Sequence, residues 1–518
     1  MPEVPSLLPI ALLAVPAGLA VIAYPLARMA RPLGPILNLL GAGAATALAV
    51  PVVVHTVQGG VLVSLSRELR ADALSALLVL VISGVALAAA VYSFPYMRLE
   101  LLLDRVGRAA GPEVTKRRLA TFYTLSLAFL TTMLGACLTN NIIMLYVAVE
   151  ASTIASGLLV AFYWDRRSLE AAYKYLILLT VGIAFALFGC VFLYASAAPH
   201  LSGEAGVRGM LITDLSQVAH YIPHGIALLI LSFFIVGFGT KAGLAPFHPW
   251  LPDAHAEAPS PVSALLSGVM IKMAIYAFAR TVTIFFPAAA YHPVAVFIVV
   301  LACFTMLLGG VMCLAQDDLK RMLAYSSVSQ MGYIALGLGL VGIGFGQSAA
   351  YLGSYGSLFH LLNHALAKAA LFLAVGAIIY AMGGRRRISE LRGMARRMPV
   401  TAVIFFVAAF AISGMPPFNG FWSKLTLYLA AAEAKLWWAL GIAILTSVLT
   451  LVAFIRAGYH VFWSDAEPQV GESEVREAPL AMLVPMGVLA GLCVLIGLYP
   501  QVVYPLLHRA ALALASIQ

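Results

Sequence analysis

A small set of ionisable side chains lies inside long apolar stretches of the sequence. A charged group in the hydrocarbon core of a membrane costs about 2.5–3.5 kcal/mol on insertion scales, so such residues usually face a partner or a water-filled cavity. Lysine, glutamate and histidine can bind and release protons, and we take this set as candidates for a proton pathway. The candidates are Glu150, Lys174, Lys241, Lys272, His360, His364, Lys368 and Lys424.

A carboxylate and a lysine inside a membrane can act as a protonation switch. Burial disfavours the charged form of an ionisable group, whereas a nearby opposite charge favours it. A change in the distance between the two groups therefore changes the tendency of the lysine to hold a proton. Glu150 is the candidate carboxylate, and Lys241 and Lys272 lie deepest among the internal lysines. Lys174 lies about one turn into its helix, where its long side chain could also reach the membrane surface.

His360, His364 and Lys368 are spaced i, i+4 and i+8, which places them on one face of a helix. A neutral imidazole accepts a proton on one nitrogen and releases one from the other, so this row suits a proton wire. Two histidines at i and i+4 also match part of a zinc site. The acid of an H-E-x-x-H motif and a nearby third ligand are missing, so we expect no metal here. Ordinary packed histidines remain the alternative.

The composition indicates an all-α polytopic membrane protein. Of 518 residues, 62% are hydrophobic and only 10% are charged, against about 45–50% and about 25% in soluble domains. This argues against a soluble enzyme or a nucleic-acid-binding protein. The five cysteines form no C-x-x-C pair and fall in apolar runs, which predicts packed thiols. Phosphate-binding and nucleophile-elbow motifs are also missing, so we expect no catalytic or redox centre in this chain.

Apolar runs predict about fourteen membrane-spanning helices of roughly 20 residues or more. A small hairpin is predicted at Val61–Arg70, where apolar and polar residues alternate, and a short surface helix within 199–222. The predicted helices are 5–27, 33–57, 72–94, 118–138, 141–163, 168–197, 223–254, 260–286, 293–315, 322–341, 346–382, 398–432, 436–463 and 479–512.

The distribution of Lys and Arg among the loops predicts the orientation of the chain in the membrane. Of the 31 Lys and Arg residues, 19 fall in loops after odd-numbered helices and 5 in loops after even-numbered ones. Cytoplasmic loops carry the excess of positive charge, so the odd loops are predicted to be cytoplasmic. With fourteen helices, both termini then lie on the outer, periplasmic side of a prokaryotic inner membrane.

Two helices are predicted to be interrupted. One contains Pro246, Pro249 and Pro252, and the other contains Pro416 and Pro417. Proline removes a backbone donor, and in lipid the freed groups need a protein or water partner. Broken helices at corresponding places in two halves are typical of inverted repeats with an ion path at mid-membrane.

These motifs resemble the antiporter-like membrane subunits of respiratory complex I and their relatives. Those relatives include group 4 membrane-bound [NiFe] hydrogenases, formate hydrogenlyases, hydrogenase-4 and multisubunit cation/proton antiporters. The resemblance spans roughly residues 70–465 and is carried by TKAGLAPFHPWLPDAHAEAPSPVSALLSGVMIKM (240–273), DLKRMLAYSSVSQMGY (318–333), HLLNHALAKAALFL (360–373) and GMPPFNGFWSK (414–424).

The resemblance implies fourteen helices with two inverted five-helix repeats, each containing one broken helix. The implied parts are an N-terminal unit (1–117), a first repeat (118–286), a second repeat (287–463) and a C-terminal unit (464–518). Glu150 and Lys241 would form the proton-loading pair, and Lys272 would be the connecting lysine. His360, His364 and Lys368 would match the polar row of the eleventh helix. Lys424 would end the second half-channel.

By the same resemblance, the activity is proton translocation driven by electron transfer in partner subunits. Expected partners are the lipid bilayer, other membrane subunits including further antiporter-like ones, and peripheral redox subunits, with no nucleic acid. Iron–sulfur, nickel–iron or flavin centres are expected only in those partners. A multisubunit cation/proton antiporter and a proton-driven inorganic-carbon uptake system remain alternatives.

Overall fold

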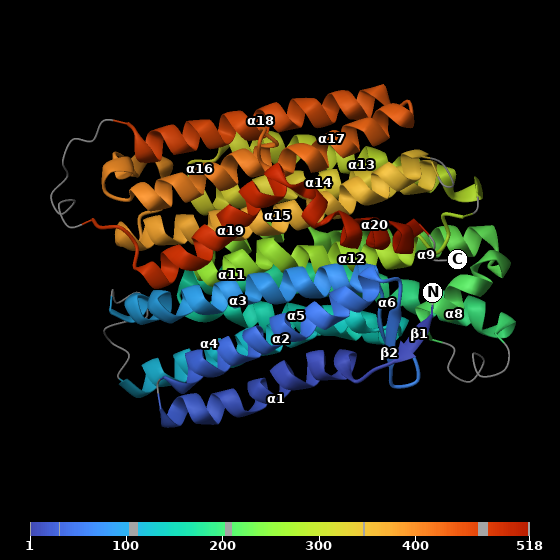
Figure 1. Cartoon of the computed structure of the whole chain (residues 1–518), viewed down its shortest axis with the longest axis horizontal. Helices are drawn as coiled ribbons and strands as arrows, with labels where there is room; N and C mark the ends of the chain where they lie inside the picture. The colour runs from blue at the N-terminus through green and yellow to red at the C-terminus, as the bar shows by residue number, and fades with distance from the viewer. Residues whose placement is uncertain are drawn as a thin grey trace.

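The computed structural model describes residues 2–30, 32–102, 112–201, 210–287, 289–344, 348–464 and 475–515. Within them, long helices run side by side along one axis of the molecule (Figure 1). Thirteen described helices are long and apolar enough to cross a membrane, and a further apolar helix, Pro399–Ser413, is shorter. The prediction of an all-α polytopic membrane protein is confirmed.

The N-terminal helices are α1 (Leu8–Met29), α2 (Leu33–Val57) and α3 (Ala73–Leu102). Between α2 and α3, β2 (Val61–Ser64) pairs antiparallel with β3 (Leu69–Ala71), which confirms the predicted hairpin. An unpredicted strand, β1 (Glu3–Pro5), pairs parallel with β2. The predicted first helix therefore began too early, because Pro5 belongs to this strand.

A second group of helices carries four of the candidate residues. It comprises α4 (Pro112–Leu138), α5 (Ile142–Val160), α6 (Arg166–Ala197), α9 (His224–Ala242), α10 (Trp250–Glu257), α11 (Ser260–Leu265) and α12 (Ile271–Val282). A π-helical turn, Leu266–Met270, joins α11 to α12. The predicted surface helix is α8 (Ile212–Val218), and residues 202–209 of that prediction lie outside the described residues.

The third group holds the remaining candidates. It comprises α13 (His292–Ala315), α14 (Leu319–Ile343), α15 (Ser348–Ala381), α16 (Pro399–Ser413), α17 (Asn419–Glu433) and α18 (Trp437–Phe462). The prediction of one last helix over 479–512 was wrong. Two helices, α19 (Leu480–Leu498) and α20 (Tyr504–Ala515), flank a short turn at Pro500–Val502, because Pro500 cannot continue the hydrogen-bond ladder.

The first predicted interruption separates α9 from α10. Gly243 ends α9 with a φ of +75°, which glycine adopts without a steric penalty. The backbone groups freed by the break find partners inside the protein. The amide of Ala245 donates to Thr305 Oγ1 (3.1 Å), and Trp250 Nε1 donates to the Thr240 carbonyl (2.9 Å). Protein groups thus replace the water that lipid cannot supply.

The second interruption separates α16 from α17. Gly414 ends α16 with a φ of +86°. Gly420, in the first turn of α17, lies so close to α16 that an added Cβ would sit 1.8 Å from the carbonyl oxygen of Ala411. The close approach of these two segments therefore requires glycine at position 420.

The described ends of the chain lie at one end of the bundle. β1 and α20 are found there together with β2 and α8 (Figure 1). The strand β1 and the helix α20 therefore come to the same end of the bundle. The repeat boundaries at 118–286 and 287–463 stay a prediction.

Gly420→Ala should destabilise the fold. The new methyl group would meet backbone rather than a movable side chain, and overpacking of this kind costs about 1–3 kcal/mol. The measurement is the apparent unfolding temperature of the purified protein in detergent. Gly441→Ala is the matched control, because nothing lies within 4 Å of an added Cβ there. Equal unfolding temperatures for the two variants would contradict the close approach.

Candidate functional site

Six of the eight candidate residues lie in the interior of the bundle. Lys241, Lys272, His360, His364 and Lys368 have no exposed surface, and Lys424 is 2% exposed. They come from α9, α12, α15 and α17. We call this set, together with the half-buried Glu150 of α5, the buried polar row.

Thr153 bridges Glu150 and Lys241 at the first break. Lys241 Nζ donates to Thr153 Oγ1 at 2.7 Å, and the same hydroxyl lies 3.3 Å from Glu150 Oε2, to which it can donate. Thr180 donates to the other carboxylate oxygen at 2.9 Å. Among the described ion pairs, none joins Glu150 directly to Lys241, so the hydroxyl is the connection between them.

The ring of Tyr175 also lies close to Lys241. Its Nζ lies 5.7 Å from the ring centroid of Tyr175, a cation–π contact. Tyr175 is fixed in turn by a 2.5 Å hydrogen bond with Ser156 and an edge-to-face contact with Trp250. These contacts fix the ring of Tyr175 beside the ammonium.

Lys272 depends on an irregularity of its own helix. Its Nζ donates to the carbonyl of Ser267, which lies in the π-helical turn before α12. π-Turns disturb the regular helix ladder and are frequent at functional sites. The hydroxyl of Ser267 is 2.8 Å from that of Ser327 on α14, so this segment contacts the helix that serves the second half of the row.

The three members of the row on α15 differ in their hydrogen-bond partners. His360 has a partner on each nitrogen, with Ser423 at 3.0 Å from Nδ1 and Gln330 Oε1 at 3.0 Å from Nε2. Lys368 donates to the Leu323 carbonyl at 2.9 Å and to Ser326. His364 lies between them, and neither of its nitrogens has a hydrogen-bond partner in the described structure. The unpaired imidazole of His364 thus separates the two hydrogen-bonded members of the row on α15.

Lys424 ends the row after the second break. Its Nζ donates to the carbonyl of Ser413 at 3.2 Å and to Ser447 Oγ at 3.0 Å, and it lies 4.6 Å from the ring centroid of Tyr333. Ser447 also lies 2.6 Å from the hydroxyl of Tyr428. The surroundings of Lys424 therefore consist of hydroxyl groups, a carbonyl and an aromatic face.

Lys174 lies at the surface, apart from the buried polar row. Half of its side chain is exposed, and it forms ion pairs with Glu170 (2.8 Å) and Asp253 (3.4 Å). The structure thus favours the surface alternative for Lys174 and does not bring it into the buried polar row. As for metal ions, no group of three or more His, Cys, Asp or Glu in the described residues is arranged to hold one.

Sequence reasoning missed the hydroxyl and amide partners of the row. Thr153, Ser326, Gln330, Ser423 and Ser447 each contact a member of it. Uncharged polar residues are common in membrane helices, so they do not stand out as lysines do. Thr153 could have been found from its place three residues after Glu150 on the same helix face.

The chain was then compared with known proteins. The profile described as NADH:quinone oxidoreductase/Mrp antiporter, TM, matches residues 139–450, and the profile described as NADH-ubiquinone oxidoreductase (complex I), chain 5 N-terminus, matches 61–105. The chain belongs to the NADH:quinone oxidoreductase/Mrp antiporter family. The resemblance inferred from the motifs is confirmed.

Curated relatives come from several kinds of complex. NADH-quinone oxidoreductase subunit N of Desulforudis audaxviator is 36% identical over 448 residues, covering 84% of this chain and 82% of that protein. The hydrogenase-4 component F homolog of Methylacidiphilum infernorum is 32% identical, covering 79% and 82%. A Na⁺/H⁺ antiporter subunit of Bacillus subtilis is 33% identical, covering 76% of this chain but 50% of that protein.

Solved structures share the fold over nearly the whole chain. A chain of the archaeal membrane-bound sulfane sulfur reductase has a TM-score of 0.82 and 27% identity, covering 99% of this chain and 98% of that one. A chain of the Mrp complex from Dietzia sp. also has a TM-score of 0.82, with 26% identity and coverage of 98% and 97%. These neighbours are members of multisubunit membrane complexes.

Thr153→Val should reduce proton flux through the intact complex. Valine keeps the shape of threonine but removes the hydroxyl between Glu150 and Lys241, and a positioned proton-transfer group contributes about 10²-fold or more. Flux can be followed with a pH-sensitive dye inside proteoliposomes. Ser152→Ala is the control, because the Ser152 hydroxyl bonds only to the Val149 carbonyl of its own helix (2.6 Å). Equal fluxes in the two variants would contradict the bridge.

Proposed function

We propose that this chain is the proton-translocating, antiporter-like subunit of a membrane-bound redox complex of the hydrogenase-4 or complex I type. The observation that carries the proposal is the buried polar row, which begins at Glu150, Thr153 and Lys241 beside one broken helix and ends at Lys424 beside the other. A structural anchor would have no reason to retain buried ammonium groups of this kind.

The row supports an electrostatic mechanism. Lys241 can hold a proton while Thr153 links it to Glu150, and it discharges that proton when the link opens. A change in charge at Lys241 then acts on Lys272, and a charge change there acts on the residues of α15. At each step only interactions that differ between the two charge states shift the equilibrium. Electron transfer in partner subunits would supply the initial change.

The proposed partners follow from the relatives. Other membrane subunits, including further antiporter-like ones, would flank this chain, and peripheral subunits would carry iron–sulfur, nickel–iron or flavin centres. The named functions of the hydrogenase-4 component F homolog and of NADH-quinone oxidoreductase subunit N support a redox-driven complex. This chain would supply the proton path alone.

A cation/proton antiporter of the Mrp type is the second candidate. The fold similarity to the Mrp complex and the sequence similarity to the Na⁺/H⁺ antiporter of Bacillus subtilis favour it. The two candidates differ in their driving force. Proton flux that requires a sodium gradient and no electron donor would favour the antiporter, and flux that follows electron transfer in sodium-free buffer would favour the redox complex.

Lys241→Ala should abolish proton translocation while leaving electron transfer in the partner subunits partly intact. The substitution removes the ammonium that Thr153 connects to Glu150. Glu150→Gln should weaken translocation similarly, because the carboxylate charge is lost. The measurement is proton uptake by proteoliposomes beside the rate of electron transfer.

Lys174→Ala is the matched control for loss of a lysine charge. It removes two ion pairs at a half-exposed position, and we expect proton flux to stay within about twofold, because such pairs contribute little. Normal flux in Lys241→Ala would refute the assignment. A loss in Lys174→Ala equal to that in Lys241→Ala would return Lys174 to the pathway.

We further propose that both termini face the outer side of a prokaryotic inner membrane. The loop charges support this orientation, and the described ends of the chain share one end of the bundle. A reporter that is active only in the cytoplasm should be inactive when fused to the C-terminus and active when inserted beside Arg385 in the predicted cytoplasmic loop. The reverse pattern would invert the orientation.

A further inference from the structure

One face of α4 changes from basic to apolar along its first turns. The spacing of its members matches the helical repeat, which places them on one side of α4. They are Val114, Arg117, Arg118, Thr121, Phe122 and Leu125. Since α4 begins at the end of the bundle opposite the strands β1 and β2 (Figure 1), the arginines of this face lie nearer to that end than the apolar residues that follow them.

A hollow of about 410 Å³ lies between this face and the end of α5. On the α5 side it is lined by Leu158, Leu159, Phe162 and Trp164, and we call the space between these residues and the α4 face the α4–α5 hollow. Phe122, Leu159 and Phe162 are buried and form its floor. Leu158 and Trp164 form its rim, where they are 46% and 61% exposed.

Packed aromatic rings make the floor of the hollow rigid. The rings of Phe122 and Phe162 meet edge to face with their centroids 5.5 Å apart. Each also packs against its neighbour in the sequence, Phe122 against Tyr123 at 5.2 Å and Phe162 against Tyr163 at 5.4 Å. Such edge-to-face contacts are a preferred geometry of aromatic pairs. The floor therefore presents a preformed apolar surface.

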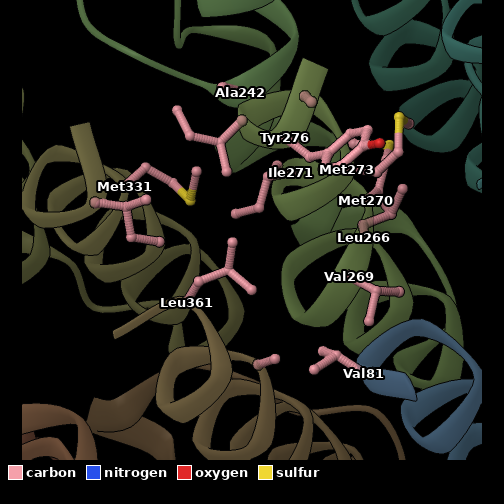
Figure 2. Close-up of a cluster of buried hydrophobic side chains, with 14 of the residues drawn as sticks. Val81, Ala242, Leu266, Val269, Met270, Ile271, Met273, Tyr276, Met331 and Leu361 are labelled. Atoms are coloured by element: carbon pink, nitrogen blue, oxygen red, sulfur yellow. The ribbon is translucent and has the colours of Figure 1, made fainter. Parts of the chain in front are cut away.

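Apolar side chains in the interior of the bundle cover one another, unlike those at the rim of the hollow. Figure 2 shows an interior cluster in which Val81, Leu266 and Met331 come from three helical segments. All three are at most 4% exposed. About half of Leu158 and more than half of Trp164 stay uncovered by the described part of the chain. Their apolar surface is thus left for a group from outside the chain.

The mouth of the hollow also carries positive charge. Arg117 and Arg118 line it, and none of its described lining residues is acidic. Glu113, one turn before Arg117 on α4, already pairs with Arg28 (3.2 Å) and Lys116 (3.3 Å). The excess of Lys and Arg on the cytoplasmic side of membrane proteins accounts for basic residues at one end of a helix, but not for their position at the mouth of an apolar hollow.

Trp164 marks the depth of the mouth in the membrane. It lies in the tight connection between α5 and α6, where its φ of +56° is uncommon for a bulky residue and its amide donates to the Ala161 carbonyl (2.9 Å). Tryptophan is enriched at the interface between membrane and water, at the level of the lipid headgroups. The exposed indole therefore places the mouth where headgroups end and acyl chains begin.

We propose that the α4–α5 hollow is a binding site for one anionic phospholipid of the membrane leaflet at this end of the bundle. The phosphate binds Arg117 and Arg118, because guanidinium groups form short, charge-assisted hydrogen bonds with phosphate oxygens. An acyl chain lies against Leu158 and the aromatic floor, where it gains dispersion contacts. This inference uses the membrane-spanning fold and does not depend on the proposed function.

The length of the hollow favours a lipid over a helix of a partner subunit. Arg117 and Leu125 are eight residues apart, so the hollow extends about 12 Å along α4. A partner helix crosses about 30 Å of hydrocarbon, and most of its length would lie beyond this hollow. A headgroup with the first part of its chains fits a hollow that is confined to one leaflet.

Photo-crosslinking tests the site in the purified intact complex in mild detergent. The probes are phosphatidylglycerol and phosphatidylcholine with a diazirine on one acyl chain, each added in trace amounts, and labelled residues are identified by mass spectrometry. We expect phosphatidylglycerol to label residues 121–125 and 158–164 at least about fivefold more than phosphatidylcholine, which is the contribution of one basic side chain at an anionic membrane surface.

Two variants test the two parts of the site. Arg117→Gln combined with Arg118→Gln should abolish the preference for phosphatidylglycerol, because it removes the charges that bind the phosphate. Leu158→Trp keeps both arginines but fills the rim of the hollow, and it should lower labelling by phosphatidylglycerol at least about fivefold, because it removes the space for the chain. The amount of complex recovered checks assembly.

Each variant has a matched control outside the hollow. Arg166→Gln combined with Arg167→Gln removes two adjacent, exposed charges from the first turn of α6, at the same end of the bundle. Leu178→Trp adds an indole at a position on α6 that is 41% exposed. Both controls should keep the preference for phosphatidylglycerol at residues 121–125 and 158–164.

A preference that is lost in the two test variants and kept in the two controls would support the proposal. Equal labelling by the two lipids in the unsubstituted complex would overturn it without any variant. An equal loss in the controls would also overturn it, as would a lack of label from either lipid at these residues, which would show that a partner subunit covers the hollow. The proposed function is tested separately by the proton flux of Lys241→Ala.

Discussion

Each ammonium group in the interior of this bundle must find an acceptor that lipid cannot provide. Three lysines of the buried polar row find it in the backbone: Lys272 at the carbonyl of Ser267, Lys368 at that of Leu323 and Lys424 at that of Ser413. Ser267 lies in a π-turn and Ser413 at the end of a broken helix, where carbonyls are freed from the regular ladder. For Lys272 and Lys424 the irregular backbone and the buried charge therefore depend on each other, whereas the acceptor of Lys368 lies within the regular helix α14.

The two breaks carry different chemistry. Lys241 precedes the first break and is connected through Thr153 to a carboxylate. Lys424 follows the second break and has hydroxyl groups, a carbonyl and the ring of Tyr333 around it. An acid beside a lysine can change its charge by a small movement, whereas hydroxyl groups can only pass a proton on. The first break thus places its lysine near a carboxylate, whereas the second places its lysine among neutral partners.

Much of this organisation could be predicted from the sequence. Charges in apolar runs stand out, so six buried members of the row were found, and prolines marked both breaks. Three-residue β1 was missed because it is too short to show alternation, and its pairing with β2 joins distant segments. The turn at Pro500 was missed because the sequence on both sides of it is apolar and was taken as one helix. Lys174 lies apart from the row, because position along a helix does not tell which side faces the surface, where Glu170 and Asp253 pair with it.

The helix α14 connects parts of the row that are far apart in the sequence. Ser326 contacts Lys368, Ser327 contacts the Ser267 segment that holds Lys272, and Gln330 contacts His360. These three α14 residues are fully buried and lie within little more than one helical turn. A small shift or rotation of α14 would alter all three contacts together, because interiors are close-packed and rigid elements move as units. α14 thus presents polar groups to both halves of the row, and a single movement of this helix would change contacts in both.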